Sequence, residues 1–101
     1  MMQLKFIYEV AVMLKRHRDQ LWARLDELYA NGSTFISWGE IYHWYSIERI
    51  NKKPWRDIEA RWKELLEEKE ERYLSPQTAE VGGGVTLFYA KKPRPLKELA
   101  A

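Results

Sequence analysis

The sequence lacks cysteine, and it has no run of about 18 apolar residues. The first absence excludes disulfides, thiolate metal sites and a cysteine nucleophile. The second predicts a protein without a membrane-spanning helix, and we expect a cytoplasmic location. The apolar stretch from Leu4 to Leu14 carries Lys5 and Glu9 and lacks a small-residue cleavage site, so we do not interpret it as a signal peptide.

Residues that could perform catalysis are also scarce. The two histidines, His17 and His43, fall on different predicted helices without a carboxylate at ligand spacing, so no metal site is predicted. The glycines Gly82, Gly83 and Gly84 precede neither Lys-Ser nor Lys-Thr, which argues against a phosphate-binding loop and favours a hairpin. Because no nucleophile–base pair or carboxylate pair stands out either, we expect neither an enzyme nor a cofactor.

The chain nevertheless has the composition of a folded domain. Its 101 residues are 46% hydrophobic and 14% aromatic, with five Trp and six Tyr that need a core or an interface. We predict one domain over residues 1–92 and a mobile tail over residues 93–101, after Pro93. The tryptophans are expected to pack in the core more than to stack on bases, with Trp55 the most exposed.

Charge is segregated along the chain although the net charge is only +2. Between Arg49 and Lys63 there are six basic residues against two acidic ones, a net charge of +4. Between Glu64 and Glu71 there are five Glu against Lys69, a net charge of −4. Segregation of this kind produces a field at one face of a protein.

A first long helix is predicted from about Met2 to Ala30, with Asn31-Gly32 ending it. Its first part is apolar on nearly every side, which favours burial against a second copy of the chain. A strand is the alternative over residues 4–12, because apolar residues also alternate there. The predicted homodimer interface consists of Leu4, Phe6, Ile7, Val10, Ala11 and Leu14.

The remaining elements are shorter. We predict a minimal strand at residues 34–36, followed by a helix from about Trp38 that Ser37 and Glu40 begin with a capping box, with Ile36 and Ile41 as its hydrophobic staple. A third helix is expected from Pro54 to about Arg72, weakened at its end by like-charged Glu pairs. Strands at residues 73–74 and 85–90 would enclose a flexible loop from Ser75 to Gly84.

This order of elements resembles the winged-helix superfamily over roughly Leu21 to Lys92. The resemblance is carried by the strand Thr34-Phe35-Ile36, the helix start Ser37-Trp38-Gly39-Glu40-Ile41, the helix from Pro54 to Leu66 and the hairpin from Tyr73 to Ala90. It implies a mostly α fold with a small β-hairpin, a winged helix-turn-helix with a long N-terminal helix. It also implies a DNA-binding protein and a transcriptional regulator, with the third helix of each subunit of a dimer in the major groove of double-stranded DNA.

Under that interpretation, a set of basic residues would contact nucleic acid: Arg49, Lys52, Lys53, Arg56, Lys63, Lys91 and Lys92. The predicted hairpin loop carries Glu80 and no Lys or Arg, so contact of the loop with the minor groove is not expected. The alternative is a protein-interaction or adaptor module that uses the same fold and docks its apolar N-terminal helix on another protein. The low net charge and the acidic helix end favour this alternative.

Overall fold

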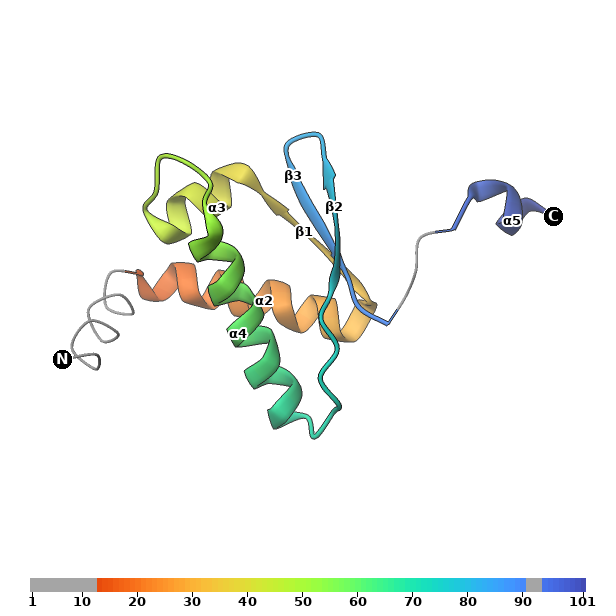
Figure 1. The fold of residues 1–101 in the computed structure, drawn as a ribbon, viewed down its shortest axis with the longest axis horizontal. Helices are drawn as coiled ribbons and strands as arrows, with labels where there is room; N and C mark the ends of the chain where they lie inside the picture. Colours follow the sequence, from red (N-terminus) through yellow and green to blue (C-terminus); the bar gives the residue numbers. More distant parts are fainter. Residues whose placement is uncertain (1–12, 91–93) are drawn as a thin grey trace.

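A computed structural model describes residues 13–90 and 94–101 of the chain. Within them, three main helices pack beside a small antiparallel sheet (Figure 1). The fold is therefore mostly helical with a small β-sheet, as expected from the sequence. The elements are α2 (Lys15–Asn31), β1 (Ser33–Ser37), α3 (Trp38–Tyr45), α4 (Lys52–Glu68), β2 (Gln77–Val81), β3 (Gly84–Phe88) and α5 (Leu96–Ala100).

Helix α2 begins later than the apolar periodicity predicts. Leu14 is its N-cap, with extended backbone and no side-chain cap, so the predicted continuous helix through residues 13–14 is wrong. The choice between helix and strand for residues 4–12 lies outside the described residues. At the other end, Gly32 adopts φ 84° and its N–H donates to the Leu28 carbonyl, which confirms the predicted helix stop.

The start of α3 confirms the local prediction made from Ser37 and Glu40. The Ser37 hydroxyl accepts a hydrogen bond from the Glu40 backbone N–H at 3.1 Å, and the Glu40 carboxylate accepts one from the Ser37 N–H at 3.0 Å. Ile36 and Ile41 on either side of the cap are fully buried. The short strand before α3 also forms, although β1 is longer than predicted at both ends.

Helix α4 is displaced from the predicted span. It begins two residues before Pro54, where the Asn51 side chain accepts a hydrogen bond from the Lys53 N–H at 2.8 Å. It ends at Glu68, not at Arg72, and Glu70 follows with φ 56°. The early end agrees with repulsion between glutamates four residues apart in the last turns.

The hairpin differs more than any other element from the prediction made from the sequence. The predicted strand at residues 73–74 is wrong, because Tyr73 and Leu74 have no regular structure, and β2 lies inside the segment predicted as a loop. Strand β3 ends at Phe88, two residues before the predicted end. It is central in the sheet order β1-β3-β2, with Ile36 opposite Val85 on one side and Glu80 opposite Val85 on the other.

The core is formed where α2, α3, α4 and the inner face of the sheet meet. Its largest fully buried side chains are Trp44, Trp62, Leu21, Leu25, Leu28, Ile36, Ile41, Leu65 and Leu66. Both buried indoles are satisfied: Trp44 donates to the Gln20 side chain and Trp62 to the Leu74 carbonyl, each at 2.9 Å. Trp55 is half-buried and meets Trp38 edge to face at 6.2 Å, so it is less exposed than expected.

Helices α2 and α3 are also joined by a two-point ion pair. Arg24 donates to both carboxylate oxygens of Glu40, at 3.0 and 2.7 Å, and to the Phe35 carbonyl. Burial alone would raise the pKa of Glu40, but hydrogen bonds from Ser37 and Arg24 outweigh it and hold the pKa below its usual value. The ionised carboxylate therefore stabilises the junction of α2, β1 and α3.

The C-terminal segment contains a feature that the predicted tail did not include. Residues Leu96–Ala100 form the short helix α5, which lies away from the sheet and the other helices (Figure 1). None of its residues is buried, and Leu96 and Leu99 are 78% and 61% exposed.

Candidate functional site

The N-terminal half of α4 carries the main group of predicted site residues. Lys52, Lys53, Arg56 and Lys63 are all exposed. Successive helical residues are about 100° apart, which places Lys52, Arg56 and Lys63 within about 40° of one another on the helix surface. We call these three residues the basic ridge of α4. Trp62 and Ile58, about 100° and 140° around the helix from the centre of this ridge, are buried and fix which side faces solvent.

The start of α4 adds to the positive potential of this ridge. Lys52 and Lys53 occupy the first turn, and this turn contains no acidic residue. The N-terminal end of a helix carries a partial positive charge from its unpaired N–H groups. The charges of Lys52 and Lys53 repel this partial positive charge, and a bound anion would offset the repulsion. The arrangement is therefore one that an external anion would stabilise.

The two acidic residues in this half of α4 are held by neighbouring side chains. Asp57 accepts hydrogen bonds from the Arg61 Nε at 2.8 Å and from the Tyr45 hydroxyl at 2.6 Å. Burial, together with the adjacent Asp57 charge, raises the pKa of Tyr45, so its hydroxyl remains a donor. Glu59 accepts from the hydroxyls of Tyr73 and Ser75, at 3.0 and 3.2 Å.

Arg61 does not belong to the exposed surface, although it lies within the basic segment of the sequence. It is half-buried, it pairs with Asp57, and its guanidinium lies 5.8 Å from the centre of the Trp22 ring. The ridge residues, in contrast, form no ion pair within residues 13–90 and 94–101. Among the described residues the charge of the ridge is thus unpaired, whereas that of Arg61 is used in packing.

The other predicted contacts are only partly described. Arg49 is exposed in the connection between α3 and α4. Lys91 and Lys92 lie outside the described residues. The same holds for the predicted dimer contacts Leu4, Phe6, Ile7, Val10 and Ala11. The sixth of these, Leu14, is the N-cap of α2 and is 48% exposed.

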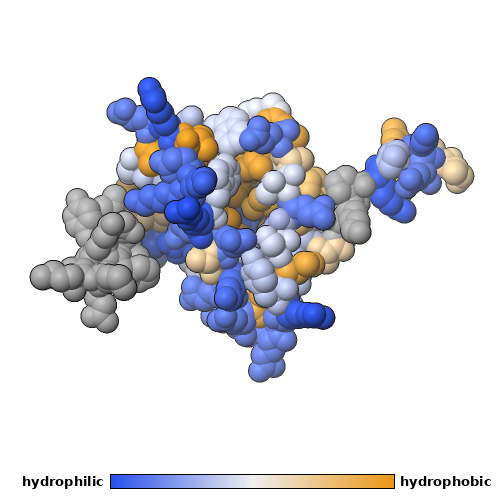
Figure 2. All heavy atoms as spheres, viewed as in Figure 1, coloured by the Kyte–Doolittle hydropathy of each residue, from blue (hydrophilic) through white to orange (hydrophobic). Residues whose placement is uncertain are grey.

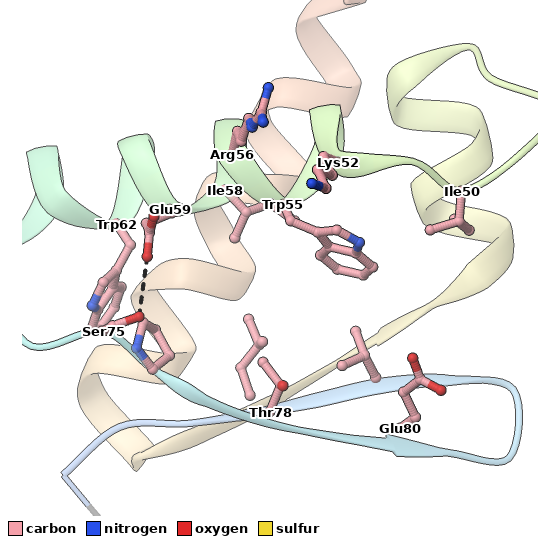
Figure 3. Close-up of a pocket in the computed structure, with 13 residues that line it drawn as sticks. Ile50, Lys52, Trp55, Arg56, Ile58, Glu59, Trp62, Ser75, Thr78 and Glu80 are labelled. Atoms are coloured by element: carbon pink, nitrogen blue, oxygen red, sulfur yellow. Dashed lines mark hydrogen bonds between the residues drawn. The ribbon is translucent and has the colours of Figure 1, made fainter.

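A groove that the sequence did not predict separates α4 from the hairpin. It encloses about 470 Å³, and Figure 3 shows α4 along one wall and β2 along the other. Trp55, Ile58 and Trp62 contribute from α4, and Val85 and Leu87 contribute from β3. Figure 2 shows hydrophobic side chains between α4 and the hairpin, bordered by hydrophilic ones. The groove beside the basic ridge is therefore lined mainly by apolar side chains and bordered by polar ones.

The two walls of the groove carry opposite charges at one end. Lys52 extends from α4 at the mouth, and Glu80 points from β2 toward Trp55 (Figure 3). Lys52 and Glu80 do not form an ion pair across the groove. Arg56 lines the groove with its stem, and its guanidinium points away from the hairpin (Figure 3).

The hairpin turn cannot provide a cation to a ligand. No Lys or Arg occurs from Ser75 to Ala90. The turn is also held against the fold, because the Trp38 backbone N–H donates to the Gly83 carbonyl at 3.0 Å. The turn therefore adds no positive charge to the surface beside α4.

Neither a metal-binding cluster nor a membrane-spanning helix is found in the described part of the chain. Within residues 13–90 and 94–101, no group of three His, Asp or Glu side chains is placed to hold a metal ion. Among the helices described, none is long and apolar enough to cross a membrane. No protein family, curated protein or solved structure matches the chain.

Proposed function

We propose that the chain is a winged-helix DNA-binding protein whose α4 enters the major groove of duplex DNA. The observation that carries the proposal is the basic ridge, three exposed cations on the first half of a helix with no partner among the described residues. The order α2-β1-α3-α4-β2-β3 and the sheet order β1-β3-β2 support the winged-helix assignment. In that fold the third helix is the element that reads the major groove.

The positions of the cations suggest which of them would contact phosphates and which would contact bases. Lys52, Lys53 and Arg49 lie at or before the first turn of α4, where phosphates are favoured by the helix end. Arg56 and Lys63 lie further along the exposed side and could reach base edges, where Arg binds guanine through two hydrogen bonds. The acidic last turns of α4 would remain outside the major groove of the DNA. A regulator of transcription acting as a homodimer is the corresponding biological role.

The proposal is tested by titrating generic duplex DNA at two salt concentrations and following fluorescence anisotropy. The triple variant Lys52→Ala/Lys53→Ala/Arg56→Ala should bind far more weakly than wild type. If each cation contacts one phosphate, the slope of log K against log salt should fall by about 2.7 per protomer. The matched control Lys15→Ala/Arg16→Ala/Arg72→Ala removes the same charge outside α4 and should retain most of the wild-type affinity. Equal loss in both variants, or no binding by wild type at low salt, contradicts the proposal.

A second candidate function is favoured by the groove. An exposed apolar surface bordered by charges is typical of sites that bind another protein, and Glu80 opposes an approaching phosphate. Under this alternative the chain is an adaptor, and the same titration would detect no DNA binding. The predicted use of the N-terminal helix as the docking element lies outside the described residues.

A further inference from the structure

The groove between α4 and the hairpin has the size of a small-molecule site. Its volume of about 470 Å³ falls within the roughly 300–1,000 Å³ that such sites occupy. These sites are lined mainly by apolar and aromatic side chains, with a few charged groups that orient the ligand. Here Ile58, Val85 and Leu87 form an apolar floor, and each is at most 5% exposed. The two walls above this floor therefore decide which ligand the groove can take.

The β2–β3 register places a carboxylate beside the floor. Glu80 is directly opposite Val85, and Thr78 is opposite Leu87. Directly opposed side chains of an antiparallel pair lie on the same face of the sheet, so Glu80 shares the inner face with Val85. Glu80 is exposed and forms no ion pair within residues 13–90 and 94–101. Its charge thus faces whatever lies on the floor.

The opposite wall carries a cation and an aromatic ring. Lys52 is exposed in the first turn of α4 and, among the described residues, has no carboxylate partner. In Figure 3 the Trp55 ring projects from α4 toward the hairpin, between Lys52 and Glu80. The ring is half-buried and meets Trp38 edge to face, so part of it is left for contact with a ligand.

Two other charged residues line the groove, and neither competes for a ligand in it. The Glu59 carboxylate already accepts hydrogen bonds from the hydroxyls of Tyr73 and Ser75. The guanidinium of Arg56 points away from the hairpin (Figure 3). The charges that a ligand in the groove would meet are therefore those of Lys52 and Glu80.

We propose that this groove binds a free apolar α-amino acid, with its carboxylate beside Lys52, its ammonium beside Glu80 and its side chain against Trp55. A simple anion would be repelled by Glu80, and a simple cation would be repelled by Lys52. A zwitterion satisfies both walls at once, and a free amino acid carries both charges next to its apolar side chain. An aromatic side chain would gain most, because aromatic rings pack favourably edge to face or offset.

Binding is tested without DNA, using L-phenylalanine as the probe and the indole N–H signals in a ¹H–¹⁵N spectrum of the full chain. The Trp55 signal, assigned by its absence in Trp55→Phe, should move in a saturable manner. The signal of Trp44, which is buried and bonded to Gln20, should stay in place. The absence of a saturable shift at Trp55 up to about 10 mM probe, tenfold above a weak Kd of about 1 mM, overturns the proposal.

Analogues that lack one charge test the role of each wall. N-acetylphenylalanine lacks the ammonium group, and phenylalaninamide lacks the carboxylate. Each should bind about tenfold more weakly than phenylalanine, because one hydrogen bond between charged groups is lost. Equal affinity of either analogue overturns the proposal, and equal affinity of the amide would assign the groove to the amino end of a peptide instead of a free amino acid.

Substitutions at the two walls test the orientation. Glu80→Gln should weaken phenylalanine binding about tenfold without weakening that of N-acetylphenylalanine, and Lys52→Met should do the same for phenylalanine without weakening that of phenylalaninamide. Both positions are exposed, so the fold should persist. The matched controls Glu64→Gln and Lys97→Met, exposed and outside the groove, should bind phenylalanine like wild type. Equal losses in the controls, or exchanged effects of the two analogues, overturn the assigned orientation.

The consequence for DNA rests on the proposed function. A bound amino acid would place its carboxylate beside Lys52, where a DNA phosphate is proposed to bind. Saturating phenylalanine should therefore weaken duplex binding by wild type at least about fivefold, the lower end of typical coupling between two sites. A Trp55 shift without any DNA binding would support the amino-acid site and refute the DNA proposal, and DNA binding without a Trp55 shift would do the reverse. Unchanged DNA affinity at saturation would overturn this coupling alone.

Discussion

Gly84 gives the sharpest prediction about stability. A Cβ added at this position would lie 2.3 Å from the Ile36 carbonyl oxygen and 2.8 Å from the Ser37 Cα. Both are backbone atoms of β1, which cannot rotate away as a side chain could. The substitution Gly84→Ala therefore forces β1 and β3 apart at the point where the sheet meets the start of α3. We expect the free energy of unfolding to fall by about 3 kcal/mol, the upper part of the range for overpacking.

Two neighbouring glycines provide graded controls in the same turn. At Gly82 an added Cβ meets nothing within 4 Å, so Gly82→Ala should change stability by less than about 0.5 kcal/mol. Gly83 has the same open space but φ 87°, and the left-handed backbone makes Gly83→Ala cost about 1 kcal/mol. The expected order of stability is thus set by two separate causes, backbone strain at one position and collision at the other.

Urea denaturation followed by tryptophan fluorescence measures all three variants against wild type. The buried indoles of Trp44 and Trp62 report on the core, which contacts the sheet. If Gly84→Ala is no less stable than Gly83→Ala, the close approach of β1 to β3 is wrong. The register that pairs Ser37 with Gly84 would then have to be revised.

Two further predictions follow from polar contacts. The pKa of Glu40 is lowered in the folded chain, so its charge contributes stability above the unfolded pKa, and this contribution is lost as pH falls through the folded value. At neutral pH the free energy of unfolding of wild type should exceed that of Glu40→Gln by about 1 kcal/mol. Urea denaturation at a series of pH values should show this difference disappearing in acid. A difference that is the same at every pH would contradict the role of the ion pair with Arg24. Trp62→Phe leaves the Leu74 carbonyl without its donor and opens space in the core, so thermal unfolding should detect a loss of about 2 kcal/mol, and an unchanged midpoint would contradict the importance of this link.

The parts of the fold that were predictable from the sequence depend on neighbouring residues. The cap formed by Ser37 and Glu40 needs only two side chains and the backbone between them, and it appears where expected. The stop at Gly32 is local in the same sense. The apolar spacing of α4 likewise identified Ile58 and Trp62 as buried. The predicted ends of α4 were less accurate, because periodicity indicates which residues face the core and not where the first turn begins.

Strand β2 could not be found in this way. Its five residues, Gln77–Val81, bury little, and their extended conformation is stabilised by pairing with β3 across the hairpin turn. An edge strand of this composition has a weak intrinsic preference, so its surroundings decide its structure. Pro76 and the glycines after Val81 dominated the local pattern and predicted a loop. The groove was missed for the same reason, since one of its walls is β2.

The position of Glu80 decides how the basic ridge can be used. It follows from the β2–β3 register and places a carboxylate on the hairpin side of α4, toward Trp55. A phosphate that approached over the hairpin would meet this charge before it reached Lys52. The guanidinium of Arg56, on the same ridge, points away from the hairpin (Figure 3). Under the proposed function, DNA would therefore approach α4 from the side of the Arg56 guanidinium, away from the hairpin.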